Sequence, residues 1–311
     1  MSQVLEPYIY EGGIHKHGLI LELLEDIGGY LVQKTPAATE VTLIMLIPKD
    51  DVPLVEDLAK KLLGKVTRAP LTGVEIAVVS PTLAYHHLPH SACDIAEHLR
   101  RDGANTNMIG LARGMGRRVA NLNNYEGRLI NEHDIALYSF GIFRDCIKTK
   151  KMKLFEGINI PIIVTGGPEI ATEEVPGSDL YIGNIGRIPH RMRKSDELDA
   201  LDTMNKKVGE LIDSIRDDLS KDPLVTIPAR VMKEVHEQVP AINKVLTPSP
   251  ITLQLDGLRI KLPYDEYKSK IHHIEFDEGF ILGDIANISP SNMKNYILVK
   301  IKRESDIGFS I

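Results

Sequence analysis

Cysteine is scarce in this chain, which contains two among its 311 residues. Two cysteines cannot form the disulfide framework of a small secreted protein, so we expect a reducing, cytoplasmic location. The chain has no tryptophan and only 5% aromatic residues, which argues against a stacking platform for single-stranded nucleic acid. A net charge of −6 argues further against nucleic-acid binding, because contact with phosphates requires a basic surface.

Long apolar runs are absent as well. No stretch reaches the roughly 20 residues that span a membrane, and the first residues lack the pattern of a signal peptide. The contents of 43% hydrophobic and 26% charged residues are those of a soluble globular protein. The sequence also lacks a GxxxxGK[ST] motif, so we expect no P-loop and no ATP site in this chain.

Residues 1–70 predict a ferredoxin-like α+β domain. Apolar strand patterns alternate with two amphipathic helices in the order βαββαβ, which is the split βαβ arrangement of that fold. We expect strands at 4–10, 29–34, 41–47 and 65–69, and helices at 15–27 and 50–64. No cysteine lies in this domain, so the name of the fold implies no cluster there.

Residues 71–219 predict a central α/β domain. Continuous apolar strands separated by helices are typical of a doubly wound, mostly parallel sheet that is buried on both faces. We expect strands at 75–80, 107–111, 135–140, 160–165 and 180–183, and helices at 92–102, 124–133, 144–156 and 195–219. The last of these helices is polar and is expected to pack on the outside.

Residues 220–311 predict a small C-terminal β-rich α+β module. Strands at 251–254 and 258–262 flank Leu255-Asp256-Gly257, whose Asp-Gly pair favours a hairpin turn. Further strands are expected at 272–276, 280–282 and 296–301. The whole chain is therefore assigned to the α/β class.

Residues capable of binding follow each predicted strand of the central sheet. In open parallel sheets, ligands bind beyond the carboxyl ends of the strands, so we expect these residues to share one crevice. They are Ser80 after the first strand, Arg113 and Gly114 after the second, Arg144 and Cys146 after the third, Thr165, Gly166, Gly167 and Glu169 after the fourth, and Arg187, His190 and Arg191 after the fifth.

The first cysteine closes the segment His86-His87-Leu88-Pro89-His90-Ser91-Ala92-Cys93. Imidazoles and a thiol are ligands for zinc, copper or iron–sulfur clusters, and they can also form a nucleophilic cysteine with a histidine base. A structural zinc site normally has four ligands in two tight pairs, and Cys146 has no cysteine or histidine within four residues. A cluster with few protein ligands, or one shared with another chain, fits this ligand count better.

Each of these features also has a simpler interpretation. Either cysteine can be a small buried residue, although a cysteine in the first turn of a helix lies near unpaired amides that favour thiolate. The 165–169 turn either lets a phosphate or cluster approach the backbone or simply ends a strand. The basic residues Arg187, His190 and Arg191 form either a solvated turn or a contact with an anion or partner.

Several sequence strings resemble methanogenesis marker protein 7, and the resemblance covers nearly the whole chain. They are residues 69–73, 79–84, 86–95, 107–114, 165–169, 186–191 and 254–258. The central domain is also similar to the smaller methyl-coenzyme M reductase operon protein C, mainly around Cys93, residues 99–101 and residues 143–145. Cys146 does not match a cysteine of that smaller relative.

The resemblance implies a subunit of the ATP-dependent assembly that activates methyl-coenzyme M reductase in methanogenic archaea. Activation reduces the nickel of the reductase's tetrapyrrole. The implied partners are the reductase, its operon protein C, other methanogenesis marker proteins and a separate ATP-binding component. Neither nucleic acid nor a membrane is implied.

The resemblance further implies a complex iron–sulfur cluster at a subunit interface, with low-potential electron transfer as its role. Cys93 is then the first ligand, Cys146 the second, and His86, His87 or His90 the third. This interpretation favours an electron-transfer and assembly subunit over a stand-alone enzyme. Two alternatives stay open: an enzyme with a Cys93 nucleophile and a His90 base that acts on a phosphorylated or acyl substrate, and a metal-free scaffold.

Overall fold

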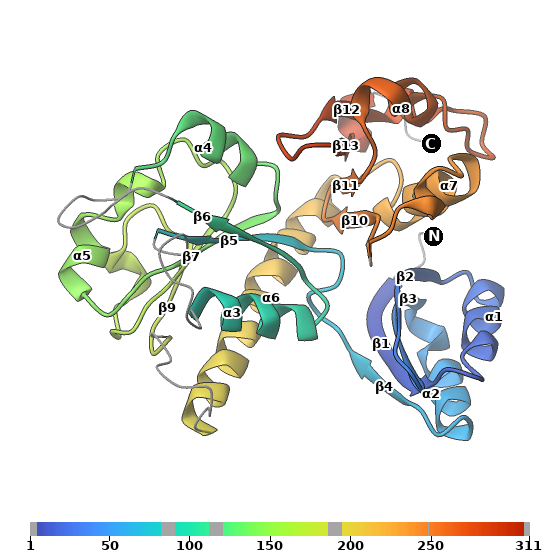
Figure 1. The fold of residues 1–311 in the computed structure, drawn as a ribbon, viewed down its shortest axis with the longest axis horizontal. Helices are drawn as coiled ribbons and strands as arrows, with labels where there is room; N and C mark the ends of the chain where they lie inside the picture. Colours follow the sequence, from blue (N-terminus) through green and yellow to red (C-terminus); the bar gives the residue numbers. More distant parts are fainter. Residues whose placement is uncertain (1–4, 82–90, 112–120, 186–194, 248, 308–311) are drawn as a thin grey trace. The chain divides into compact units, whose positions relative to one another are not determined.

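The computed structural model describes residues 5–81, 91–111, 121–185, 195–247 and 249–307 (Figure 1). A five-stranded parallel sheet and two four-stranded antiparallel sheets confirm the predicted α/β class. By contacts the chain divides into two compact units, residues 74–217 and residues 1–73 with 218–311. The predicted domain boundaries after residues 70 and 219 stay predictions. None of the described helices is long and apolar enough to cross a membrane.

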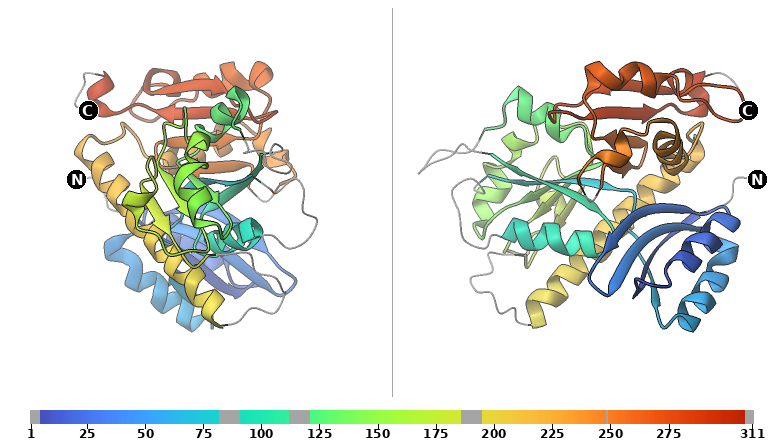
Figure 2. Two further views of the ribbon diagram at one scale, coloured as in Figure 1. Left: turned by 90° about the vertical axis from the view of Figure 1, so that its left-hand side faces the viewer. Right: turned by 45° about the vertical axis from the view of Figure 1, so that its right-hand side comes forward.

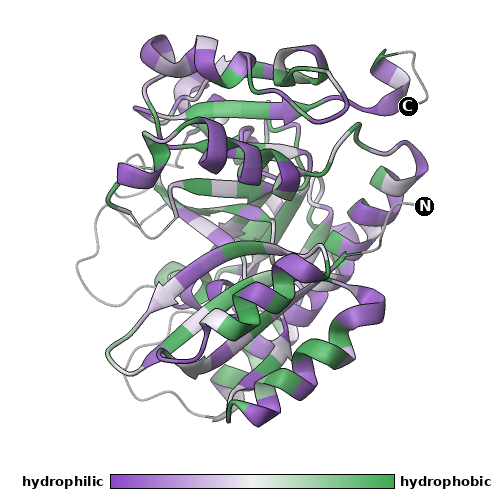
Figure 3. Ribbon diagram, turned by 90° about the vertical axis from the view of Figure 1, so that its right-hand side faces the viewer, coloured by the Kyte–Doolittle hydropathy of each residue, from purple (hydrophilic) through white to green (hydrophobic). Residues whose placement is uncertain are grey.

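The first sheet confirms the predicted ferredoxin-like topology. Its strand order is β2-β3-β1-β4, and its helices follow β1 and β3. Alternate residues of β3, from Val41 to Ile47, are buried in one core with Ile20 and Val55 of the two helices. Figure 3 shows hydrophobic and hydrophilic residues mixed along these helices, as expected where one face covers a sheet. The elements are β1 (Leu5–Gly13), α1 (Gly18–Asp26), β2 (Tyr30–Pro36), β3 (Glu40–Pro48), η1 (Lys49–Asp51), α2 (Val52–Lys61) and β4 (Lys65–Arg68).

The C-terminal sheet has the order β10-β11-β13-β12 and contains the predicted hairpin. Its turn is Leu255-Asp256, because Gly257 already belongs to the second strand and pairs with Gln254. The sheet packs in the same compact unit as the first sheet, where Tyr30 and Val32 of β2 contact the apolar core that includes Met232. The elements are α7 (Pro228–Gln238), η5 (Ile242–Lys244), β10 (Ile251–Gln254), β11 (Gly257–Ile260), α8 (Tyr264–His272), α9 (Leu282–Ile285), β12 (Ala286–Pro290), β13 (Ile297–Ile301) and α10 (Glu304–Ile307).

Two predicted strands of this module are wrong. Residues 272–276 begin at the last residue of α8, and residues 280–282 run into α9, so only an isolated bridge between Glu275 and Ile281 remains. The buried residues Ile271, Ile274 and Leu282 fill the core from helices and turns. Short apolar runs do not distinguish these arrangements from strands.

The central sheet has the parallel order β6-β5-β7-β8-β9. Numbered from β5, this is the doubly wound order 2-1-3-4-5, whose topological switch point lies between the first and third strands. The switch point here therefore lies between β5 and β7. The elements are β5 (Glu75–Ser80), α3 (Ser91–Arg101), β6 (Asn105–Gly110), α4 (Asn124–Ile130), β7 (Ile135–Ser139), α5 (Arg144–Thr149), η3 (Met152–Leu154), β8 (Ile162–Thr165), η4 (Thr172–Glu174), β9 (Leu180–Ile182) and α6 (Ser195–Lys221).

Helix α3 is anchored to the long helix α6, which lies beside it in Figures 1 and 2. His98 Nε2 lies 2.7 Å from Asp202 Oδ1, and Asn205 Nδ2 donates to the His98 carbonyl at 3.0 Å and to Asp102 at 2.8 Å. His98 and Asn205 are both buried. These bonds fix the direction of the helix that begins just before Cys93.

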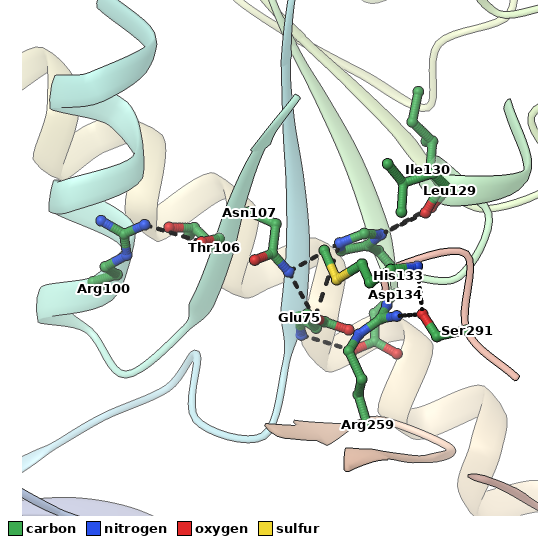
Figure 4. A network of polar contacts seen from close by, with 11 residues as sticks. Glu75, Arg100, Thr106, Asn107, Leu129, Ile130, His133, Asp134, Arg259 and Ser291 are labelled. Atoms are coloured by element: carbon green, nitrogen blue, oxygen red, sulfur yellow. Dashed lines mark hydrogen bonds and ion pairs between the residues drawn. The ribbon is translucent and has the colours of Figure 1, made fainter. Parts of the chain in front are cut away.

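A buried polar cluster lies at the amino ends of the central strands (Figure 4). Asn107 Nδ2 donates to Glu75 Oε1 at 2.7 Å and lies 3.1 Å from His133 Nε2. His133 Nδ1 lies 3.0 Å from the Leu129 carbonyl, which can only accept, so this nitrogen carries the proton. The side-chain amide of Asn107 thus donates to two buried acceptors, the Glu75 carboxylate and the His133 ring nitrogen.

Replacing Asn107 with leucine should lower the free energy of unfolding by about 1–3 kcal/mol, because two buried acceptors lose their shared donor. Thermal unfolding followed by circular dichroism measures the change. Asn105→Leu, in the same strand, is the matched control and should stay within about 0.5 kcal/mol of wild type. Equal losses for the two variants would contradict this role of Asn107.

Candidate functional site

The carboxyl ends of the five parallel strands form one row. The register pairs Ser80 with Gly110, Ser139 with Thr165 and Thr165 with Ile182. Three hydroxyl side chains, those of Ser80, Ser139 and Thr165, are buried along this row. The row contains the predicted residues Ser80 and Thr165, and it adds Ser139, which lies inside a continuous apolar run and carries no sequence signal of a site.

Cys93 is exposed and lies in the first turn of α3, as its third residue. The first residue of the helix, Ser91, contacts β7 through its hydroxyl, which lies 3.2 Å from the hydroxyl of Ser139. The start of α3 is therefore fixed to the end of the neighbouring strand. This places Cys93 beside the topological switch point.

Cys146 is half-buried and lies in the first turn of α5, the helix that follows β7. Its neighbour Ile147 is buried in the central core and fixes the helix to the sheet. The preceding residues Ile142 and Phe143 are 64% and 74% exposed, which is unusual for large apolar side chains. The two cysteines thus follow the two strands that flank the switch point.

The cations beside Cys146 are paired with one carboxylate. Glu174 Oε1 accepts from Lys148 Nζ at 2.5 Å, and Glu174 Oε2 accepts from Arg144 Nη2 at 3.1 Å. The hydrogen bonds from Lys148 and then Arg144 hold the pKa of Glu174 below its ordinary value. This ion-pair clamp joins α5 to η4.

The Glu174 clamp should open on acidification. Because folding lowers the pKa of Glu174, its stabilising contribution is present above the ordinary value of 4.5 and is lost as the pH falls through the folded-state pKa. We expect hydrogen exchange of the α5 amides to accelerate below that pH in wild type. Glu174→Gln should show the faster exchange already at neutral pH, and equal protection in both proteins at neutral pH would contradict the clamp.

The glycines of the 165–169 turn allow three strand ends to approach one another. The Gly166 amide donates to the Ile182 carbonyl at 3.1 Å, and the Gly167 amide donates to the Gly141 carbonyl at 3.2 Å. A Cβ atom at Gly166 would lie 2.7 Å from the Tyr181 hydroxyl. Both amides are engaged inside the protein, so an anion at this turn would need other donors.

A cavity of about 560 Å³ lies at the ends of β8 and β9. Glu169 and Asn184 line it, and Asn184 Nδ2 donates to Glu169 Oε1 at 2.8 Å. Burial raises the pKa of Tyr181, which also lines the cavity, to about 12. Helix α6 adds Asp199, Thr203 and Lys207, whose i, i+4, i+8 spacing is a signal of one shared helix face.

The remaining predicted site residues fall outside the described residues. They are His86, His87, His90, Arg113, Gly114, Arg187, His190 and Arg191. Among the residues that the structure does describe, no group of three or more histidine, cysteine or acidic side chains could hold a metal ion. Two thiols are half of the four ligands that common clusters take, so any cluster bound here would need further ligands.

Comparison with known protein families finds a match over most of the chain. Residues 5–274 match the family described as Methyl-coenzyme M reductase operon protein C, a longer match than the central domain alone. An uncharacterized protein of Methanocaldococcus jannaschii is 48% identical over 302 residues, which are 97% of this chain and 95% of that protein.

Solved structures are only remotely similar. The GsuK channel bound to NAD has 10% identity and a TM-score of 0.25, and the match covers 96% of this chain and 51% of the channel, about half its length. Glutamyl-tRNA reductase from Methanopyrus kandleri has 10% identity and a TM-score of 0.19, and the match covers 77% of this chain and 86% of the reductase. Neither supports a functional argument. The match over residues 5–274 shows that this chain belongs to the methyl-coenzyme M reductase operon protein C family.

Proposed function

We propose that this chain is an electron-transfer subunit of the methyl-coenzyme M reductase system, with Cys93 as a ligand of an iron–sulfur cluster. Family membership supports the link to the reductase. The observation that carries the cluster assignment is the exposed Cys93 thiol in the first turn of α3, beside the switch point of the parallel sheet. This is where parallel sheets bind ligands.

The position of Cys93 suits a metal ligand, because the helix that carries it is fixed in place by contacts within the protein. The Ser91–Ser139 contact and the His98–Asp202 pair hold α3 at two points. Unpaired amides and the dipole at the start of a helix stabilise a thiolate, which is the ligating form. Because the thiol is exposed, ligands from another chain can reach the same metal.

Cys146 is the proposed second ligand. A bound iron–sulfur cluster supplies one-electron transfer at low potential, and hydrogen bonds to its sulfurs tune that potential. Arg144 contacts Glu174 through one of its nitrogens, so its other N–H groups can donate to anionic sulfur. His86, His87 or His90 is proposed as the third ligand, with Ser80, Arg113 and the 165–169 turn around it.

The cluster is proposed to lie at a subunit interface. The exposed apolar residues Ile142 and Phe143 lie two and one positions before α5, near Cys146, and provide a surface that a partner chain can cover. The proposed partners are the reductase, its operon protein C and other marker proteins. A separate component would bind ATP, and electrons would pass toward the nickel tetrapyrrole of the reductase.

Anaerobic metal analysis tests this function. We expect iron and acid-labile sulfide in the chain purified with its partners, and an electron paramagnetic resonance signal after reduction. An iron-free chain in an otherwise iron-containing complex would contradict the proposal.

A cysteine-nucleophile enzyme is the second candidate, and the exposure of Cys93 is the observation that favours it. It predicts that iron-free protein turns over a phosphorylated or acyl substrate and that iodoacetamide, which labels Cys93, abolishes this turnover. A metal-free scaffold predicts neither iron nor turnover.

A further inference from the structure

A second cavity, of about 570 Å³, lies along one edge of the first sheet and does not involve either cysteine. One wall is formed by Leu21 and Leu24 of α1, and the other by Met232 of α7 and by Ile251. Residues 28–34, of which Tyr30–Lys34 belong to strand β2, run along it. We name this cavity the β2 groove.

The β2 groove exposes the unpaired edge of a strand. β2 pairs only with β3, and Tyr30–Lys34 make no backbone hydrogen bond outside that pairing within the described residues. Pro36 ends the strand and blocks further pairing there. The open donors and acceptors are thus confined to the part of β2 that lines the groove.

The two walls fit the side chains of an added strand. Successive side chains of an extended peptide point to opposite sides, so one would contact the α1 wall and the next the α7 wall. Leu24 and Met232 are themselves buried, and the partly exposed apolar side chains of the two walls are Leu21 on the α1 side and Pro250 on the α7 side. The groove therefore favours apolar residues at adjacent positions.

Unpaired charges of opposite sign lie at the two ends of the groove. Glu25 precedes the turn into β2, Lys34 is the last residue of the open segment, and neither has an ion-pair partner among the described residues. On the α7 wall, by contrast, Lys233 and Glu237 lie 3.9 Å apart and balance each other. A complementary occupant carries a cation at one end and an anion at the other.

We infer that the β2 groove binds an extended segment of a partner polypeptide that adds a strand to β2. The segment has adjacent apolar residues, a basic residue facing Glu25 and an acidic residue facing Lys34. Main-chain hydrogen bonds would supply affinity, and the walls and charges would supply selectivity. This inference does not depend on the proposed cluster.

Peptides of about five residues, long enough for the open edge, test the inference with the full-length chain. The probes are acetylated, amidated Lys-Val-Ile-Val-Glu and Glu-Val-Ile-Val-Lys, each with a fluorescent label and followed by anisotropy. The first places its lysine beside Glu25 when it runs parallel to β2, and the second does so when it runs antiparallel. The controls replace the end residues with two lysines or two glutamates. Because an exposed charge pair contributes little, we expect one of the two mixed peptides to bind about fivefold more tightly than either control.

Charge-reversal variants sharpen the test. Glu25→Lys should prefer the peptide with two glutamates, and Lys34→Glu should prefer the peptide with two lysines. N-methylation of alternate peptide amides on the β2 side should weaken binding about tenfold, because it removes main-chain donors. Hydrogen exchange should show protection of the Tyr30–Lys34 amides on binding.

Three results would overturn the inference. They are no binding by any peptide, equal binding of all peptides to all variants, and binding without protection of β2. Self-association of the chain that protects the same amides would assign the edge to a second copy and would also overturn it.

Discussion

Replacing Cys93 with serine is expected to lower the iron that co-purifies with the chain by at least about tenfold, since even substitutions around a metal site cost about that much affinity. Serine keeps the size of the side chain and removes the thiolate. Cys93 is exposed at the start of α3, so the substitution should leave folding unchanged. Iron and sulfide content, measured anaerobically in the complex with partners, gives the result.

Two controls accompany Cys93→Ser. Glu97→Gln changes an exposed residue one turn further along α3 and should retain the iron. Cys146→Ser removes the proposed second ligand and should also lower the iron content. Full iron content in the Cys93 variant would exclude Cys93 as a ligand whatever the other variants show.

Gly257→Ala should be the most damaging small substitution in the C-terminal sheet. A Cβ atom at Gly257 would lie 2.0 Å from the Val299 carbonyl oxygen and 3.0 Å from its carbon. These atoms belong to the backbone of β13, which pairs with β11 and cannot move away without loss of sheet hydrogen bonds. We expect a loss of about 3 kcal/mol in the free energy of unfolding, the upper end for overpacked sites.

Gly13→Ala is the matched control for Gly257→Ala. Gly13 ends β1 in the same compact unit, and no atom lies within 4 Å of a Cβ placed there. Urea unfolding followed by circular dichroism should place the Gly257 variant well below wild type and the Gly13 variant close to it. Equal midpoints for the two variants would contradict the packing argument.

Long, regular patterns made two of the three sheets predictable. The βαββαβ pattern of the first sheet and the continuous apolar strands of the central sheet extend over many residues. Over that length a helical period of about 3.6 residues can be distinguished from a strand period of two. The C-terminal module is built from short elements, and the apolar residues Ile271, Ile274 and Leu282 belong there to helices and turns. Only tertiary packing decides such cases.

The candidate site was predictable where it follows from chain order. Parallel strands bring their carboxyl ends together, so Cys93 and Cys146 could be placed on one edge before their surroundings were known. Contacts between distant segments could not be predicted from the order of the elements. The Ser91–Ser139 contact, the Glu174 clamp and the α6 residues of the cavity depend on side-chain reach across the fold, which periodicity does not encode.

The most direct test of the account is electron nuclear double resonance of the reduced complex with ¹³Cβ-labelled cysteine in this chain alone. The chain has two cysteines, so the Cys146→Ser variant carries the label only at Cys93. The account predicts a ¹³C hyperfine coupling in the cluster signal of wild type and of any cluster retained by Cys146→Ser, and loss of most of the cluster signal itself in Cys93→Ser. A cluster signal in the wild-type complex without any ¹³C coupling would show that the cluster is held elsewhere and would contradict the account.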